Sequence, residues 1–325
     1  MSKSLLETRD AAIPVVSSVA KGPAPPDFFY RAMRFFVRRT FSFWERLGLH
    51  LTMVHFYEPI PDTQAMDDSI WNPRPELAGI RMNAEFQLQL LQRLSSQCRR
   101  DWEALPRNGT SGADRFFLGN GYFDSVDAEI LYGIIRLYKP RRVWEIGSGF
   151  STLLAAQAIQ RNKEEDPSCV CDHVAIDPFP PQFLVESKTG LSVLPKRVQD
   201  VPLSAFSQLQ ANDVLFIDSS HVLKIGSDVR YEYLDILPRL QPGVLIHLHD
   251  IFFPAEYPRE WVLGQHRFWN EQYLLQAFLA FNSEFTVLWA GSYMHMNHRD
   301  LLSEAIPSYK QHQDHPKSFW IRRNS

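Results

Sequence analysis

Residues 141–159 read RRVWEIGSGFSTLLAAQAI, which is the pattern of a buried strand, a glycine turn and a helix in direct succession. Val143, Trp144 and Ile146 suit a central strand, and the Leu- and Ala-rich run over 153–158 favours a helix. The glycines between them permit a sharp turn and the close approach of a ligand. A nucleotide-like ligand is therefore expected at the carboxyl end of this strand.

The residues around the two glycines distinguish between two cofactors. A dinucleotide-binding turn carries Gly or Ala three residues after its second glycine, and Thr152 stands at that distance from Gly149. Glu145 precedes Gly147 by two residues, which fits the pattern E/D-x-G-x-G. NAD is therefore disfavoured, while an ordinary strand-to-helix turn without a ligand stays open. Ser151 or Thr152 is expected to cap the helix.

In this motif the chain resembles the class I S-adenosylmethionine (SAM) dependent methyltransferases, and the resemblance covers residues 120–325. It implies that SAM is the cofactor, that the glycine turn lies under its methionine part, and that Glu145 helps to hold the ammonium end. Asp177, which closes the second strand, is expected at the ribose hydroxyls, and Asp200 at the adenine amino group. Their alternative roles are a turn cap before Pro178 and a solvated loop carboxylate. The full set of expected cofactor-binding residues is Glu145, Gly147, Ser148, Gly149, Ser151, Asp177, Asp200 and Asp218.

Strands and helices alternate from residue 141 onward, which is typical of an α/β protein with a doubly wound sheet. The resemblance implies a seven-stranded Rossmann-like sheet in the order 3-2-1-4-5-7-6, with a reversed pair at its end. After the first strand, the others are expected at 172–177, 191–198, 213–217, 243–248, 285–290 and 318–323.

Composition sets the class of the protein. The chain has 325 residues, 45% hydrophobic and 22% charged, as in ordinary globular proteins. Its net charge of −3 gives no reason to expect nucleic acid as a partner. The three cysteines lack a metal-binding spacing and favour a reducing, cytoplasmic setting. The chain has no apolar run of about 18 residues, so no membrane span is expected.

Three regions are predicted: a disordered leader over 1–26, a mainly helical extension over 27–121, and the methyltransferase domain over 122–325. The aromatic and basic stretch 27–56 predicts an amphipathic helix. Such a helix permits weak association with an anionic membrane surface, but packing on the catalytic domain or in a homodimer is favoured. Further helices are expected over 82–105 and 122–138, and Ser125 is the predicted cap of the latter.

Polar residues follow the fourth and fifth predicted strands directly. Asp218 and His221 come after one strand, and His249 and Asp250 end the other. Since adjacent strands end at the same edge of a sheet, these four side chains are expected beside the ligand crevice. A hydroxyl acceptor must lose a proton during methylation, and histidine suits that task near neutral pH. His249 is the first choice as general base and His221 the second, with Asp250 orienting the imidazole or substrate; purely structural roles stay open.

A divalent metal is considered but not favoured. Asp218 and Asp250 match the places from which catechol-type methyltransferases bind Mg²⁺. Those families usually have Asp or Asn after the second carboxylate, whereas Ile251 follows here. His221 and His249 would suit a transition metal better than magnesium.

The order of these site residues resembles that of bacterial methyltransferases that modify sugars and natural products. This resemblance implies O-methylation of a small-molecule or glycan acceptor, namely a hydroxyl on a saccharide or specialised metabolite, in biosynthesis. The aromatic segment 251–273 is expected to form part of the acceptor pocket or a lid, and a simple cover of the sheet edge stays open as its alternative role. Three alternatives stay open: an N- or carboxyl-methyltransferase, an NAD oxidoreductase, and a non-catalytic SAM-binding or interaction protein.

Overall fold

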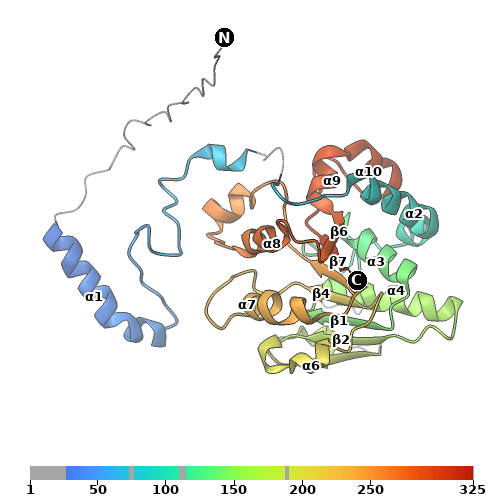
Figure 1. The fold of residues 1–325 in the computed structure, drawn as a ribbon, viewed down its shortest axis with the longest axis horizontal. Coiled ribbons are helices and arrows are strands. Elements are labelled where there is room, and N and C mark those ends of the chain that lie inside the picture. The colour runs from blue at the N-terminus through green and yellow to red at the C-terminus, as the bar shows by residue number, and fades with distance from the viewer. Residues whose placement is uncertain (1–26, 73–76, 110–114, 187–189, 325) are drawn as a thin grey trace, which may run out of the picture. The chain divides into compact units, whose positions relative to one another are not determined.

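A computed structural model describes residues 27–72, 77–109, 115–186 and 190–324 (Figure 1). The predicted leader over 1–26 lies outside the described residues. The chain divides into two compact units, Met1–Ala65 and Met66–Ser325. The described residues between 66 and 121 fall in the same unit as the sheet, and the domain boundary expected between 121 and 122 stays a prediction.

The first unit contains one helix, α1 (Asp27–Arg46), within its described residues. Thr40 ties successive turns together, since its hydroxyl donates to the Phe36 carbonyl and accepts from the Trp44 indole N–H. The helix occupies the first part of the stretch 27–56 in which an amphipathic helix was expected. Among the described residues, no helix is both long and apolar enough to cross a membrane.

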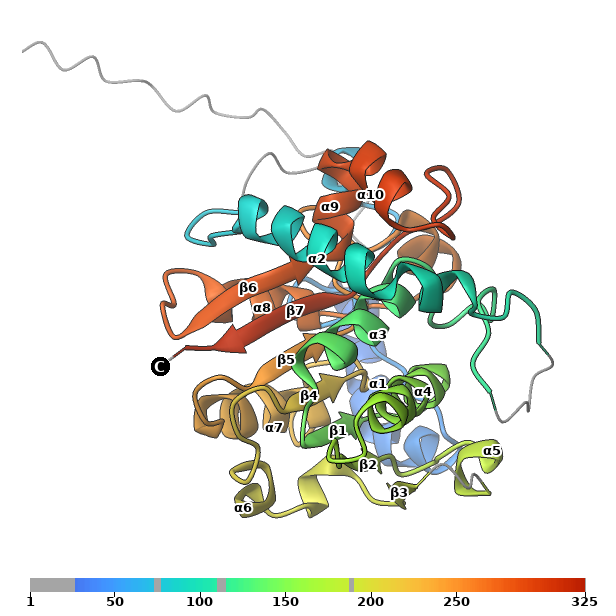
Figure 2. The same cartoon turned by 90° about the vertical axis from the view of Figure 1, so that its right-hand side faces the viewer.

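The second unit is built on a seven-stranded sheet in the order β3-β2-β1-β4-β5-β7-β6, which confirms the predicted fold (Figure 2). β7 runs antiparallel to both of its neighbours, and the other neighbouring pairs are parallel. The strands are β1 (Arg142–Ile146), β2 (Asp172–Ile176), β3 (Leu191–Leu194), β4 (Val214–Ile217), β5 (Leu245–Leu248), β6 (Phe285–Ala290) and β7 (Phe319–Arg323).

Helices cover both faces of this sheet, and the central strand β4 is accordingly apolar and buried along its whole length. The helices of the second unit are α2 (Ala84–Glu103), α3 (Asp127–Tyr138), α4 (Phe150–Glu165), α5 (Gln182–Val185), α6 (Leu203–Phe206), α7 (Asp228–Tyr231), α8 (Glu271–Leu279), α9 (Gly291–Asn297) and α10 (Arg299–Ala305). Short 3₁₀ or π turns cover Asp68–Trp71, Val198–Asp200, Glu232–Ile236, Leu237–Arg239 and Glu260–Gly264.

The alternation of side chains along β1 shows how the two faces are filled. Val143 packs into the core formed with α2, α3 and α4, which face the viewer in Figure 2. Trp144 and Ile146 point into the opposite core, where Phe206 of α6 packs edge-on against Trp144 at 5.7 Å between ring centroids. The first strand is thus buried from Val143 to Ile146, and the glycine turn that follows is held at the centre of the sheet.

The predicted cap of α3 is wrong. The helix begins at Asp127, and Val126 takes the cap position without a side-chain hydrogen bond. The hydroxyl of Ser125 instead shares a 2.7 Å hydrogen bond with the hydroxyl of Ser308. The Ser125 hydroxyl thus bonds a residue far away in the sequence and does not cap the helix.

Candidate functional site

The glycine turn lies between the carboxyl ends of β2 and β4. Gly147 has a φ of +89°, and a Cβ added there would lie 2.0 Å from the carbonyl oxygen of Asp218. Its N–H donates to the Ile176 carbonyl at the end of β2. Gly149 is extended, with a φ of 174°, and a Cβ added to it would meet open space. The first glycine is therefore required by the fold, and the second borders space that a ligand can occupy.

Glu145 supports this turn from within the core. Its carboxylate is fully buried and accepts from the Thr152 hydroxyl at 3.0 Å, while its other oxygen meets His173 Nε2 at 2.5 Å. The Thr152 hydroxyl in turn accepts from the Gly149 N–H at 3.1 Å. Thr152, not Ser151, therefore makes the cap contact of α4. Both oxygens of Glu145 thus make contacts inside the protein that hold the turn, and its expected contact with the cofactor stays a prediction.

Ser148 and Asp177 lie together at the edge of the turn. The Ser148 hydroxyl donates to one oxygen of Asp177 at 2.7 Å, and the Phe179 N–H donates to the other at 2.8 Å. Asp200 is exposed and forms an ion pair with Arg197 at 2.9 Å, which holds the pKa of its carboxyl below the usual value. Asp177, expected at the ribose, is thus bonded to the glycine turn. Asp200, expected at the adenine, is instead paired with Arg197.

The four polar residues after β4 and β5 meet, as the sequence predicts. His221 Nε2 lies 3.2 Å from an oxygen of Asp218 and 3.5 Å from one of Asp250. His249 Nδ1 lies 3.4 Å from the second oxygen of Asp218 and 3.8 Å from Asp250. We call Asp218, His221, His249 and Asp250 the central cluster. It is joined to the glycine turn through the backbone of Asp218.

One member of the central cluster reaches solvent much more than the others. The side chain of Asp218 is 33% exposed, whereas those of His221, His249 and Asp250 are all below 10%. A ligand in the crevice would therefore meet the carboxylate of Asp218 first, and the histidines lie behind it.

Glu271, which the sequence analysis did not select, holds His221 from behind. Its carboxylate lies 2.8 Å from His221 Nδ1 and accepts from the Tyr233 hydroxyl at 3.0 Å. Glu271 is the first residue of α8 and is 1% exposed. This contact directs the Nε2 atom of His221 toward Asp218. The residue lies in the aromatic segment of the sequence, but nothing local marks it as a partner of a histidine 50 residues earlier.

Two more charged residues that the sequence analysis missed complete the surroundings of the cluster. Asp127, at the start of α3, lies 3.6 Å from His249 Nε2 and accepts from the backbone N–H groups of Lys317 and Ser318. The Lys317 ammonium lies 2.8 Å from Asp250. His249 therefore has a carboxylate at each ring nitrogen.

These contacts set the charges of the cluster. Burial alone would lower the pKa of His249, but the charges of Asp218 and Asp250 raise it to about 9. Burial would also lower the pKa of His221, but its contacts with Asp218 and Glu271 raise that pKa well above the usual value. Burial would raise the pKa of Asp218, but His249 and His221 hold it well below the usual value. These directions favour a charged carboxylate at Asp218, which is partly exposed, and protonated imidazoles at His221 and His249 near neutral pH.

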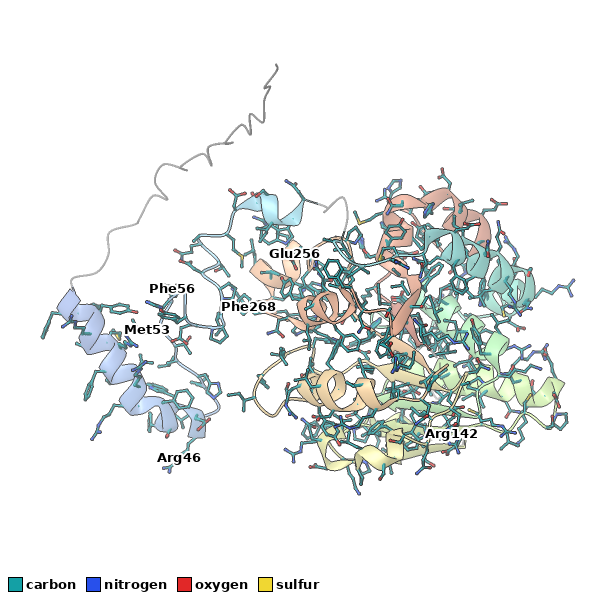
Figure 3. The ribbon with its side chains drawn as sticks, in the orientation of Figure 1. Arg46, Met53, Phe56, Arg142, Glu256 and Phe268 are labelled. Carbon is teal, nitrogen blue, oxygen red and sulfur yellow. The ribbon has the colours of Figure 1, made fainter. Side chains whose placement is uncertain are left out.

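The segment 251–273 lies against this cluster, as expected. The Trp269 ring lies 4.3 Å from the His221 ring, and Trp261 packs edge-on against Trp269 at 5.3 Å. Figure 3 labels Glu256 and Phe268 of the same segment. The segment anchors to α8 through Tyr257, whose hydroxyl accepts from the backbone N–H of Gln272 at 3.0 Å. It is therefore a fixed wall of the site.

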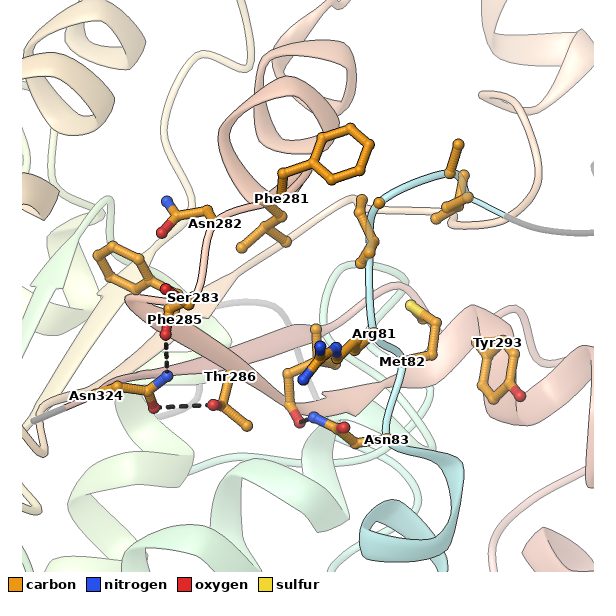
Figure 4. Close-up of a pocket in the computed structure, with 16 residues that line it drawn as sticks. Arg81, Met82, Asn83, Phe281, Asn282, Ser283, Phe285, Thr286, Tyr293 and Asn324 are labelled. Carbon is orange, nitrogen blue, oxygen red and sulfur yellow. Dashed lines mark hydrogen bonds between the residues drawn. The ribbon is translucent and has the colours of Figure 1, made fainter.

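A separate hollow of about 1020 Å³ lies along the edge strand β6 (Figure 4). It is formed by the segment 77–83, the residues from 279 to 287, Tyr293 and Asn324. Its polar rim includes Arg81 and Thr286, and the Asn83 side chain bonds the Val287 carbonyl at 3.2 Å. None of the residues that line it belongs to the central cluster or the glycine turn, so this hollow is distinct from the predicted site.

Known proteins resemble this chain over the part that contains the glycine turn and strands β1 to β5. Residues 144–251 match the model of a family described as a methyltransferase domain. An uncharacterized protein from Archaeoglobus fulgidus is 30% identical over 167 residues, covering 49% of this chain and 73% of that protein.

Solved structures resemble the chain more distantly. The O-methyltransferase TomG from Streptomyces achromogenes, involved in tomaymycin synthesis and solved with SAM, is 15% identical with a TM-score of 0.37, covering 79% of this chain and 94% of TomG. An O-methyltransferase from Bacillus cereus, solved with SAH, is 12% identical with a TM-score of 0.36, covering 74% and 90% of the two chains. Because these scores are low, the solved structures carry no argument, and the assignment rests on the family model over residues 144–251 and on the strand order. On those grounds the chain belongs to the class I SAM-dependent methyltransferase family.

Proposed function

We propose that this protein transfers a methyl group from SAM to a hydroxyl group of a small molecule, with saccharides and specialised metabolites as the acceptor class. One observation carries the proposal: the partly exposed carboxylate of Asp218 lies between two histidines, and the backbone carbonyl of Asp218 packs against Gly147. A donor on the glycine turn and an acceptor at Asp218 would therefore be neighbours.

The cofactor would occupy the open space beside Gly149, with Ser148 and Asp177 within reach of its ribose hydroxyls. In the reaction the acceptor oxygen forms a bond to the methyl carbon while the carbon–sulfur bond breaks. S-adenosylhomocysteine leaves, and the hydroxyl proton passes to a base. Holding the two reactants in line supplies much of the acceleration.

We assign Asp218 to holding the acceptor hydroxyl and His249, directly behind it, to accepting the proton. This role requires the neutral imidazole. With a pKa of about 9, only about 1% of His249 is neutral at pH 7. The carboxylates that position His249 therefore also keep most of it protonated, and unable to accept a proton, at neutral pH.

The rate of methyl transfer is expected to rise about tenfold per pH unit above pH 7 and to level off near pH 9, the pKa of His249. The sign follows because a raised pKa keeps the base protonated until the pH passes it. A pH profile of kcat checks this, with His249→Gln as the variant that should lose the rise. A wild-type profile that stays flat between pH 7 and 9 would remove His249 from the role of base.

The residues of the cluster also fit a divalent metal. Asp218, His221 and Asp250 each offer one ligand atom, and these atoms lie within 4.8 Å of one another. Glu271 at His221 Nδ1 is the kind of carboxylate partner that orients a metal-binding histidine. These three residues would hold an ion only if the Nε2 atom of His221 loses its proton and Lys317 leaves Asp250, so the raised pKa of His221 and this ammonium group both oppose a bound cation. A bound ion would act as a Lewis acid on the acceptor hydroxyl.

Calorimetric titration of the full-length protein with SAM and with NAD, each before and after EDTA treatment, tests the proposed function. Micromolar binding of SAM and no binding of NAD is the expected result, and a change after EDTA would identify a metal requirement. Binding of NAD alone would overturn the proposal in favour of an oxidoreductase. Binding of neither would favour the non-catalytic alternative.

A further inference from the structure

Two tryptophans of the segment 251–273 hold an arginine in place above the site. The guanidinium carbon of Arg267 lies 4.9 Å from the ring centre of Trp261 and 5.2 Å from that of Trp269. The backbone N–H of Arg267 donates to the Trp261 carbonyl at 2.8 Å, which closes the loop between the two rings. The position of this side chain is therefore fixed by two aromatic faces and by its own backbone.

Arg267 is exposed, and no carboxylate of the described residues lies within 4.0 Å of its guanidinium. The neighbouring cations differ in this respect. Arg259 pairs with Asp68 at 3.3 Å and lies over Trp71, and Lys317 pairs with Asp250. An arginine that is stacked but unpaired keeps its planar set of donors available for a carboxylate or phosphate.

The location of Arg267 relates it to the reaction. Trp269 contacts the His221 ring at 4.3 Å and also carries the guanidinium of Arg267. A single indole thus separates the arginine from the central cluster. A molecule whose hydroxyl meets Asp218 could lie along this indole and place a second group at Arg267.

We propose that the acceptor carries an anionic group, a carboxylate or a phosphate, and that Arg267 binds it. This inference rests on the proposed function, since it names the class of molecule methylated at the same site. The anion would be bound by paired N–H···O contacts, which fix orientation as well as position. Because the aromatic faces already hold the side chain, little conformational freedom is lost on binding. An acceptor of this kind, such as a hydroxylated aromatic acid or a sugar acid, would be held with its hydroxyl toward Asp218.

The experiment uses small probes in place of the unidentified acceptor. The full-length protein is titrated at low ionic strength with benzoate, phenyl phosphate and the neutral analogue benzamide, followed by tryptophan fluorescence and calorimetry. At least one anion is expected to bind about tenfold or more tightly than benzamide, and which anion binds tighter separates carboxylate from phosphate recognition. Arg267→Gln should abolish this advantage, and the matched control Arg259→Gln should keep it.

The inference is overturned if all three probes bind alike or not at all, if Arg267→Gln keeps the preference for anions, or if Arg259→Gln removes it equally. The SAM titration separates this failure from failure of the proposed function. Binding of SAM without a preference for anions would leave the methyltransferase and reject the anionic acceptor. An anion preference that depends on Arg267, without SAM binding, would leave an anion site and reject the reaction.

Discussion

Replacing Gly147 with alanine is expected to lower the free energy of unfolding by about 3 kcal/mol or more and to abolish SAM binding. The new methyl group would lie 2.0 Å from the Asp218 carbonyl oxygen, and the residue would have to keep a φ of +89°. Neither the end of β4 nor the turn can move without disturbing the other. Urea unfolding followed by circular dichroism measures the loss, and calorimetry measures SAM binding.

The same substitution at Gly149 is the matched control. Its φ of 174° suits any residue, and the added methyl group would meet open space. The free energy of unfolding should therefore change by less than about 1 kcal/mol. SAM should bind about tenfold or more weakly, because a methyl group forced into a packed contact costs about 1–3 kcal/mol. Equal loss of stability in the two variants would contradict the geometry of the turn, and unchanged SAM affinity in Gly149→Ala would contradict the placement of the cofactor.

Replacing Asp218 with asparagine should lower kcat about 100- to 1000-fold while the protein stays folded. The change removes the charge of the most accessible carboxylate of the central cluster, and with it the group that we assign to the acceptor hydroxyl. Steady-state kinetics with a methylated acceptor gives kcat, and thermal unfolding confirms that the variant is folded.

A second readout distinguishes this role from a merely structural one. The charge of Asp218 helps to raise the pKa of His249 to about 9, so the pH profile of Asp218→Asn should level off below pH 9. Asp300→Asn is the control, since this carboxylate is exposed on α10 and lies outside the cluster. An Asp218→Asn variant with the kcat and pH profile of the wild type would exclude the carboxylate from the mechanism.

The sheet could be predicted because its signals are local. Runs such as Val214–Ile217 are apolar from end to end, and polar residues follow them at the edge where a ligand binds. The residues of the central cluster were found for the same reason, since each lies within four residues of the end of a strand. Capping was less predictable at α3, because Ser125 meets Ser308 in the folded chain.

The surroundings of the cluster could not be predicted from local patterns. Glu271 begins a helix and Asp127 begins another, and both positions look like ordinary acidic residues in a first helical turn. Only the packing of distant segments brings them to His221 and His249. Asp127 adds to the effect of Asp218 and Asp250 on the pKa of His249, and this addition was not visible in the sequence.

The antiparallel strand β7 determines when the site can form during synthesis. β7 lies between β5 and β6 in the sheet, although it is the last strand in the chain. The residues just before it, Lys317 and Ser318, donate their backbone N–H groups to Asp127, which faces His249. A growing chain that has completed β6 therefore still lacks both the strand that joins β5 to β6 and the backbone groups that orient this carboxylate. Asp127 can be fixed beside His249 in this way only when β7 has entered the sheet.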